Sequence, residues 1–107
     1  MLEVRKREGA LRDLIAIWVW YADHAGTEIA DRFYDAVEST LMSIAKTPEM
    51  GMRVPSGKKA EPGLRKIPVG GGFGKYLLLY VRVDGGVDLV RVVHGNRDLT
   101  ALGLLKP

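Results

Sequence analysis

The segment 91-RVVHGNRDL-99 gathers the side chains of this sequence that are best suited to chemistry. His94 ends a run of β-type residues, and Arg91 and Arg97 flank it. A histidine can act as a general acid or base when a partner group positions it. No Ser or Cys nucleophile motif accompanies His94, and no second histidine or carboxylate stands at a metal-ligand spacing. A strand-end histidine with a structural hydrogen bond is therefore favoured, and acid–base catalysis is the alternative.

Cationic side chains on the neighbouring predicted strands could bind phosphates or a carboxylate-rich segment. They are Arg65, Lys66, Lys75 and Arg82. Residues 1–50 carry six Lys/Arg and nine Asp/Glu, whereas residues 51–107 carry ten and four, so the halves have net charges of −3 and +6. This asymmetry indicates an acidic partner, either nucleic acid or an acidic protein segment. A solvated charged surface is the alternative.

The composition excludes several classes of protein. The 107 residues fit one domain over 1–107 and contain no cysteine, which excludes a disulfide scaffold and a cysteine-based zinc site. A reducing cytoplasm is the simplest compartment, and we expect neither a metal nor another cofactor. The first residues carry charges where a signal peptide needs an apolar segment. The longest apolar run, 14-LIAIWVWYA-22, is shorter than the roughly 20 residues that span a membrane.

A helical hairpin is predicted in the first half of the chain. From Ala10 onward the apolar residues recur at three- and four-residue steps, which is one face of a helix. A second stripe of this kind runs from Ile29 to Ala45. Between the stripes, Gly26 suits the C-terminal cap of one helix and Thr27 suits the N-cap of the next. The short connection predicts that the two helices pack antiparallel.

Strands joined by turns are predicted in the second half. Apolar and β-branched residues predict strands over 64–69, 75–83 and 87–94. The glycine-rich segment 70–74 and the Asp-Gly-Gly at 84–86 are typical of the turns between them.

Shorter segments complete the predicted fold. Leu2 and Val4 alternate with charged residues as in a short strand, and 49–63 is typical of a loop. Asp98 could cap a short C-terminal helix over 99–105. The order β-α-α-β-β-β predicts an α+β fold, in which a short N-terminal strand precedes an antiparallel helical hairpin packed on an antiparallel sheet.

The strand over 75–83 has two largely apolar faces, and the helices can cover only one of them. The set expected to face the helices is Leu77, Leu79, Val81 and Val83. The set on the opposite face is Tyr76, Leu78, Tyr80 and Arg82. We favour this second face as a groove for a partner, with a second core as the alternative. Trp20 also falls outside the apolar stripe of its helix and could meet a second chain.

The order of these segments resembles the RelE/ParE toxin superfamily of bacterial type II toxin–antitoxin systems. The segments that carry the resemblance are 11-LRDLIAIWVWYADHAGTEIADRFYDAV-37, 47-TPEMGMRVP-55, 62-PGLRKIPV-69 and 79-LYVRVDGGVDLVRVVHGNRD-98. They are similar to the family's helical hairpin, to its Pro-x-x-Gly loop, to its Gly-Leu/Tyr-Arg strand and to its closing strands. The resemblance implies a helical hairpin on a sheet and an antitoxin protein as binding partner.

The superfamily contains two activities. RelE-like members are ribosome-dependent endoribonucleases that cut mRNA, and ParE-like members inhibit DNA gyrase. Arg97 matches the arginine that RelE-like members carry after the final glycine. However, Leu77 stands where they have an arginine, and the tail 99–107 contains no tyrosine or histidine. His94 could still supply one acid–base group. The end 94-HGNRD-98 resembles the ParE-like branch more closely.

The resemblance therefore implies a ParE-like toxin that inhibits DNA gyrase without hydrolytic chemistry of its own and is neutralised by direct binding of its antitoxin. The alternatives are a RelE-like endoribonuclease with His94 and Arg97 in its catalytic site, or an inactive module that only binds antitoxin. The residues expected to contact the antitoxin are Trp20, Tyr76, Tyr80 and Arg82. The residues expected to contact the target are Arg65, Arg91, His94 and Arg97. An acidic or amphipathic C-terminal segment of the antitoxin fits the basic half of the chain.

Overall fold

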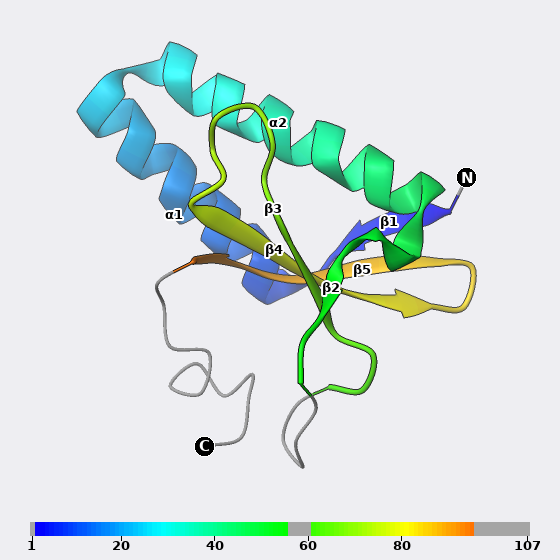
Figure 1. The fold of residues 1–107 in the computed structure, drawn as a ribbon. Helices are drawn as coiled ribbons and strands as arrows, with labels where there is room; N and C mark the ends of the chain where they lie inside the picture. Colours follow the sequence, from blue (N-terminus) through cyan, green and yellow to red (C-terminus); the bar gives the residue numbers. More distant parts are fainter. Residues whose placement is uncertain (1, 56–60, 96–107) are drawn as a thin grey trace.

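The computed structural model describes residues 2–55 and 61–95, which form a five-stranded sheet with two helices (Figure 1). The elements are β1 (Glu3–Lys6), α1 (Glu8–Ala25), α2 (Thr27–Lys46), the 3-10 helix η1 (Pro48–Met50), β2 (Met52–Arg53), β3 (Arg65–Pro68), β4 (Tyr76–Val83) and β5 (Gly86–His94). The predicted α+β class and the order of its elements are confirmed, and β2 is a short addition within the expected loop. Arg97, Asp98 and the short helix expected over 99–105 lie outside the described residues.

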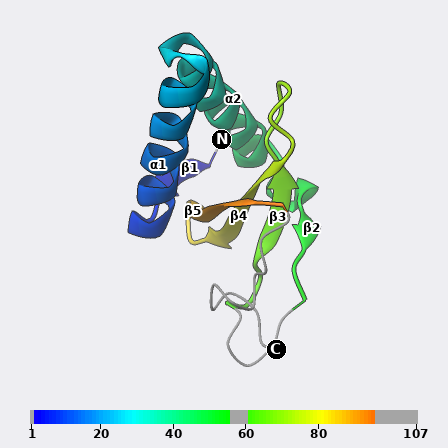
Figure 2. The same cartoon turned by 90° about the vertical axis from the view of Figure 1, so that its left-hand side faces the viewer.

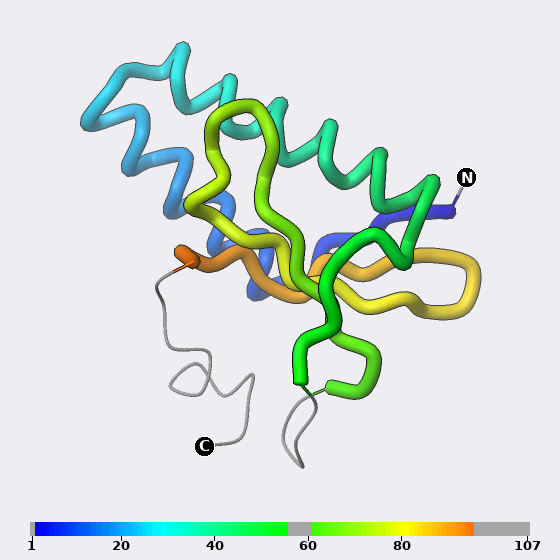
Figure 3. The backbone as a smooth tube through the Cα atoms, viewed as in Figure 1, coloured from blue at the N-terminus to red at the C-terminus, as the bar shows by residue number. Residues whose placement is uncertain are grey.

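The strands are ordered β1-β5-β4-β3-β2 across the sheet. β4 pairs antiparallel with β5 and β3, and β2 pairs antiparallel with two residues of β3. β1 departs from the expected antiparallel arrangement, because it pairs with β5 in parallel. Figure 3 shows β1, in blue, running beside the first half of β5, in yellow-orange. Local sequence patterns do not predict this pairing, since its partners come from opposite ends of the chain.

Both helices lie on the same side of the sheet (Figure 2). A single residue, Gly26, joins them, with a φ of 97°. Glycine adopts this left-handed conformation without a steric penalty, so it can turn the chain between two helices in one step. Thr27 is the first residue of α2 and its preceding cap is Gly26, so the N-cap expected at Thr27 is wrong. Among the described residues, no helix is long and apolar enough to cross a membrane.

The helix-facing side of β4 is the opposite of the one expected from the sequence. Leu78 and Tyr80 are fully buried in the main core beneath the helices, with Phe33, Val87 and Leu89. Leu79 and Val81 instead join a smaller cluster on the other face, with Val54, Leu64 and Val93. The prediction was wrong because apolar residues fill both faces of β4, so alternation alone does not say which face meets the helices.

A β-bulge in β5 adjusts which of its side chains face the helices. Leu79 pairs with Arg91 but Tyr80 pairs with Leu89, so Val90 is the extra residue. Beyond the bulge, Val92 and His94 pair with Leu78 and Tyr76, and directly paired residues share a face. The end of β5 therefore presents His94 on the same side of the sheet as α1.

Candidate binding site

Part of the predicted contact set lines one pocket between α1 and the end of β5. Trp20, Tyr76, Arg91 and His94 surround a volume of ≈ 650 Å³. The other lining residues are Asp13, Ala16, Ile17, Lys75, Val92 and Val93. This α1–β5 pocket brings together residues that the sequence assigned to two partners, since Trp20 and Tyr76 were expected to contact the antitoxin and the other two the target.

The pocket forms where α1 crosses the ends of two paired strands. Asp13, Ile17 and Trp20 follow one another at four- and three-residue spacings, so they lie on one side of α1. Tyr76 and His94 are directly paired across β4 and β5. Their ring centroids lie 5.6 Å apart at an interplanar angle of 77°. The helix and the strand pair thus provide facing walls of the pocket.

Asp13 joins α1 to β5 at the rim of this pocket. Its carboxylate accepts hydrogen bonds from Arg91 Nε at 2.7 Å and Arg91 Nη2 at 3.1 Å. It also accepts one from the backbone N–H of Val92 at 2.9 Å. The hydrogen bonds to Asp13 raise the pKa of Arg91, so the guanidinium stays charged. Arg91, expected to contact the target, is therefore also an internal tie between helix and sheet.

Trp20 is half open to solvent yet fixed in orientation. Its ring stacks on His24 with centroids 4.3 Å apart and planes at 14°. It meets Tyr21 edge to face at 5.3 Å. The side chain remains 46% exposed. An aromatic surface that is held in place and left open is well suited to binding, because little conformational freedom remains to be lost.

Tyr76 lines the pocket, and Tyr21 is a buried neighbour of both Tyr76 and Trp20. Burial is the main cause that raises the pKa of Tyr21 and the pKa of Tyr76, so both phenols are neutral near pH 7. Apart from His94, the ionisable acidic and basic side chains that line the pocket are Asp13, Lys75 and Arg91. One acid and two bases leave this lining with a net positive charge.

Tyr80 and Arg65 lie away from the pocket and fix the segment after α2. The Tyr80 hydroxyl donates to the carbonyl oxygen of Pro48 at 2.8 Å and accepts the Gly51 N–H at 2.9 Å. Arg65 Nη1 donates to the carbonyl oxygens of Glu49 at 3.1 Å and Gly51 at 2.8 Å. These residues form what we term the Tyr80 clamp. Tyr80 is 0% exposed, so it has no free surface for the antitoxin contact expected from the sequence.

The clamp requires glycine at position 51 because neighbouring atoms leave no room for a side chain, and not because of its backbone conformation. A Cβ at Gly51 would lie 2.5 Å from Tyr80 Oη and 3.0 Å from the carbonyl oxygen of Lys66. Arg82 lies near the same segment, with Nη1 3.1 Å from Glu49 Oε1 in an exposed ion pair. The structure thus separates Arg65, Tyr80 and Arg82 from the α1–β5 pocket. Arg97 lies outside the described residues.

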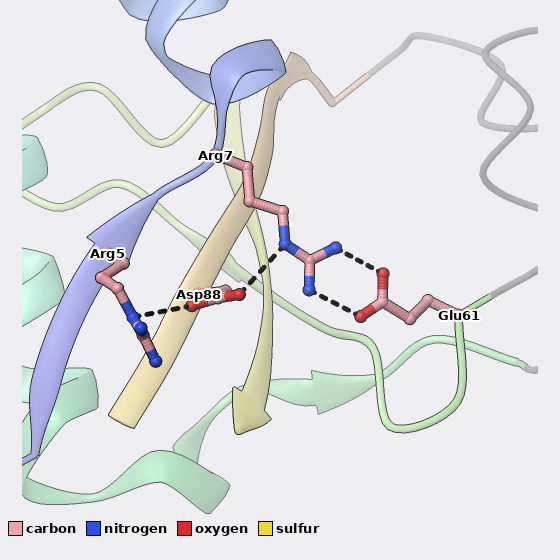
Figure 4. Close-up of polar contacts among 4 residues, drawn as sticks. All are labelled: Arg5, Arg7, Glu61 and Asp88. Carbon is pink, nitrogen blue, oxygen red and sulfur yellow. Dashed lines mark hydrogen bonds and ion pairs between the residues drawn. The ribbon is translucent and has the colours of Figure 1, made fainter. Parts of the chain in front are cut away.

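A second ionic network, which sequence reasoning did not find, joins β1, β5 and the loop before β3 (Figure 4). Arg7 Nη1 and Nη2 donate to the two carboxylate oxygens of Glu61 at 2.6 and 2.9 Å. Arg7 Nε donates to Asp88 at 3.1 Å, and Arg5 Nε lies 3.6 Å from the same carboxylate. The hydrogen bonds to Glu61 are the main cause that raises the pKa of Arg7. The network anchors Glu61 and so ends the loop at a defined place.

A separate apolar groove lies between α1 and α2. It has a volume of ≈ 410 Å³ and is lined by Leu11, Leu14, Ile15, Trp18, Asp31 and Tyr34. Ile15 is 64% exposed and Leu11 45% exposed. Trp18 Nε1 donates to Asp31 at 3.1 Å, which links the two helices at one end of the groove. Open apolar surface of this kind is typical of sites that bind proteins.

The acidic and histidine side chains of the α1–β5 pocket do not form a metal-binding cluster within the described residues. Within residues 2–55 and 61–95, no three His, Cys, Asp or Glu side chains come close enough to hold a metal ion. The pocket's carboxylate, Asp13, already accepts hydrogen bonds from Arg91 and Val92.

Comparison with known proteins supports the resemblance seen in the sequence. The model of the family described as the ParE toxin of the type II toxin–antitoxin system parDE matches residues 4–99. A solved structure described as the chromosomal ParDE toxin–antitoxin system from P. aeruginosa is similar, with a TM-score of 0.70 and 18% sequence identity. The match covers 88% of this chain and 96% of that one. A search of curated protein sequences finds no significant match. At this identity the structural similarity shows the fold, whereas the family model identifies the family.

Proposed function

The chain belongs to the ParE toxin family of type II toxin–antitoxin systems, and from this premise we propose that it inhibits DNA gyrase and is neutralised by direct binding of an antitoxin. The observation that carries the proposal is the family match over residues 4–99, which spans both helices and the strands of the sheet. The similar solved structure is itself described as a ParDE system, which supports an antitoxin as partner. With DNA gyrase as the target, the activity takes place in the cytoplasm.

We assign the antitoxin contact to the open apolar surface of α1. Leu11, Ile15 and Val19 follow one another at four-residue spacing and are 45%, 64% and 46% exposed. Trp20, on the side of α1 that lines the α1–β5 pocket, is a second open apolar contact and is also 46% exposed. An amphipathic segment of the antitoxin can bury such a stripe. Because Tyr80 is fully buried, it does not contact the antitoxin and affects this surface only by stabilising the fold.

The target-directed contacts are assigned to the end of β5. His94 lies on the pocket wall beside Tyr76, and Arg97 follows it in the sequence. Arg91 contributes charge there while remaining bound to Asp13. Arg65 donates to backbone carbonyls of the Tyr80 clamp, and we therefore give it a structural role and not a target contact. The proposed inhibition requires binding alone, so no catalytic residue is assigned.

The proposal is tested by the supercoiling activity of purified DNA gyrase. The purified chain should inhibit supercoiling, and addition of the antitoxin should restore it. Primer extension on translated mRNA, run in parallel, should show no cleavage. Inhibition of gyrase without mRNA cleavage supports the proposal.

The same pair of assays distinguishes the alternatives. Site-specific mRNA cleavage that disappears in His94→Ala, with gyrase unaffected, would establish a RelE-like endoribonuclease and overturn the proposal. Neither effect, with antitoxin binding retained, would identify an inactive binding module. The Lys66→Met variant serves as the control in both assays and should behave like the unmodified chain. Lys66 pairs with Leu79 and so points to the face of the sheet away from the helices.

A further inference from the structure

Lys75, at the mouth of the α1–β5 pocket, has its ammonium group among three aromatic rings. Its Nζ lies 5.8 Å from the ring centroid of Trp20, 5.7 Å from that of Tyr21 and 5.8 Å from that of Tyr76. Each distance is within the range of a cation–π interaction. Rings from α1 and from β4 therefore position the cation without using a carboxylate.

Among the described residues that line the pocket, none forms an ion pair with Lys75. Asp13, the acidic residue of the pocket lining, uses its oxygens on Arg91 and on the Val92 N–H. Among the ion pairs of the described residues, none involves Lys75. Arg91 is thus neutralised within the fold, and Lys75 remains available to an anion from outside.

The surroundings of Lys75 indicate which kind of anion fits. A phosphate is usually bound by several donors, such as a helix N-terminus or a nest of backbone N–H groups. Here α1 passes the pocket with its middle residues, from Asp13 to Trp20, so the N-terminus of α1 does not point at Lys75. A single ammonium framed by apolar rings matches a single carboxylate. Ile17 and the open ring of Trp20 beside it match an apolar neighbour of that carboxylate.

We propose that the α1–β5 pocket binds an acidic side chain of the antitoxin, with the carboxylate on Lys75 and an adjacent apolar side chain against Trp20. This inference rests on the proposed function for the identity of the partner. It deepens that function, because it names the chemistry by which the antitoxin segment is recognised. It also implies that the bound antitoxin covers His94 and Arg91, which line the same pocket. Neutralisation would then be a direct occlusion of the proposed target contacts.

The test compares the affinity of the full-length cognate antitoxin for the full chain and for three variants. Lys75→Met removes the charge but keeps an apolar stem, and Lys75→Arg keeps the charge. Lys66→Met removes the same charge from the opposite face of the sheet. We expect Lys75→Met to weaken binding about tenfold, with a reduced dependence on salt, because the lost contact is between charges. Lys75→Arg should retain most of the affinity, and Lys66→Met should behave like the unmodified chain.

Equal affinities of Lys75→Met and the unmodified chain, or equal losses in Lys75→Met and Lys66→Met, would overturn the inference. Unfolding curves of each variant show whether a loss reflects misfolding, which the exposed position of Lys75 makes unexpected. The matching acid is found by replacing each Asp and Glu of the antitoxin with Asn or Gln. The replacement at the correct position should weaken binding to the unmodified chain and have no further effect on Lys75→Met.

Failure of this inference is distinguishable from failure of the proposed function. Gyrase inhibition by the free chain does not depend on the antitoxin. If the chain inhibits gyrase but Lys75→Met binds antitoxin normally, the function stands and the pocket assignment is wrong. If Lys75→Met loses affinity selectively but the chain does not inhibit gyrase, the pocket assignment stands and the target is wrong.

Discussion

The Tyr80 clamp and the α1–β5 pocket contain similar residue types but use them in opposite ways. Both combine a tyrosine of β4 with cationic side chains. In the clamp, the Tyr80 hydroxyl donates to Pro48 and accepts from Gly51, and Arg65 donates to two backbone carbonyls. In the pocket, the Lys75 ammonium lies among the rings of Trp20, Tyr21 and Tyr76, and Trp20 remains 46% exposed.

The difference shows that the partners of a polar side chain distinguish structure from binding better than its chemical type does. A buried donor or acceptor that already has its hydrogen bonds stabilises the fold, and removing one partner leaves the other unsatisfied. A charge that the fold positions but does not neutralise is available to a second molecule. Substitutions in the clamp should therefore lower the stability more than the antitoxin affinity, and substitutions of Lys75 and Trp20 in the pocket should show the reverse.

The largest effect is expected from Tyr80→Ala. This change removes a fully buried ring and leaves the Gly51 N–H and the Pro48 carbonyl without their partner. Truncating a buried aromatic side chain costs about 3–5 kcal/mol. We expect the free energy of unfolding, measured by urea titration, to fall by that amount. An unchanged unfolding midpoint would show that the clamp does not stabilise the fold.

Asp13→Ala should produce the next largest loss of stability. It leaves the Arg91 guanidinium and the Val92 N–H without the acceptor that ties β5 to α1. The side chains of Arg91 and Asp13 are 29% and 16% exposed, so solvent replaces the lost contact only in part. Hydrogen bonds to charged groups contribute about 1.5–3 kcal/mol, and urea unfolding should show a decrease of that size. Asp13→Asn, which keeps one carbonyl acceptor, should lose less. A larger loss in Asp13→Asn than in Asp13→Ala would contradict this account.

The sequence predicted the elements of this fold well because their signals are local. Apolar spacing identified the helical hairpin, and glycine-rich turns identified the ends of the β-strands. The parallel pairing of β1 with β5 was not predicted, since its register depends on residues at opposite ends of the chain. β2 was missed because it has two residues and depends on the neighbouring Tyr80 clamp for its place. The prediction of which face of β4 meets the helices was wrong because both faces are apolar.

The candidate site was only partly predictable for a related reason. Sequence reasoning identified Trp20, Tyr76, Arg91 and His94 as contact candidates from their types, and the fold brings them to one pocket. It did not identify Asp13, although an acid beside the apolar stripe of a helix is a signal for an internal partner. Lys75 was recognised only as one of several cations. Its distinction is that three aromatic rings surround its ammonium group and that none of the ion pairs within residues 2–55 and 61–95 involves it, which depends on tertiary contacts.

Trp20→Ala tests the pocket side of the comparison. Its ring contacts with His24 and Tyr21 are partly exposed, and such pairs contribute about 0.5–1.5 kcal/mol each. We therefore expect the isolated chain to melt cooperatively, with only a modest decrease in stability. Antitoxin affinity, measured by calorimetry, should decrease by tenfold or more, as for an aromatic residue at the centre of an interface. Loss of cooperative melting would instead assign Trp20 to the core.

A smaller effect, on the pH dependence of stability, is expected from the clamp. Burial raises the folded-state pKa of Tyr80 above its unfolded value of about 10. As the pH rises past about 10, the unfolded chain therefore loses this phenol proton first, and the free energy of unfolding falls. The contribution is complete below the unfolded pKa and is lost as the pH rises through the folded pKa. Tyr80→Phe has no proton to lose at this position. The stability difference between the unmodified chain and Tyr80→Phe should accordingly shrink in urea titrations above about pH 10, and a constant difference would argue against this coupling.

Arg82→Ala should have the smallest effect and sharpens the boundary between the two regions. The Arg82 and Glu49 side chains are 58% and 61% exposed, and exposed ion pairs contribute about 0.2–1 kcal/mol. Arg82 pairs with Val87 at the end of β4 opposite Tyr76, so it is remote from the α1–β5 pocket. Its loss should lower the unfolding midpoint slightly and leave antitoxin affinity within twofold of the unmodified chain. A tenfold loss of affinity in Arg82→Ala would extend the antitoxin contact to both ends of β4. The clamp region would then bind as well as stabilise, because an open cation beside a fully bonded tyrosine can serve the partner while its neighbour serves the fold.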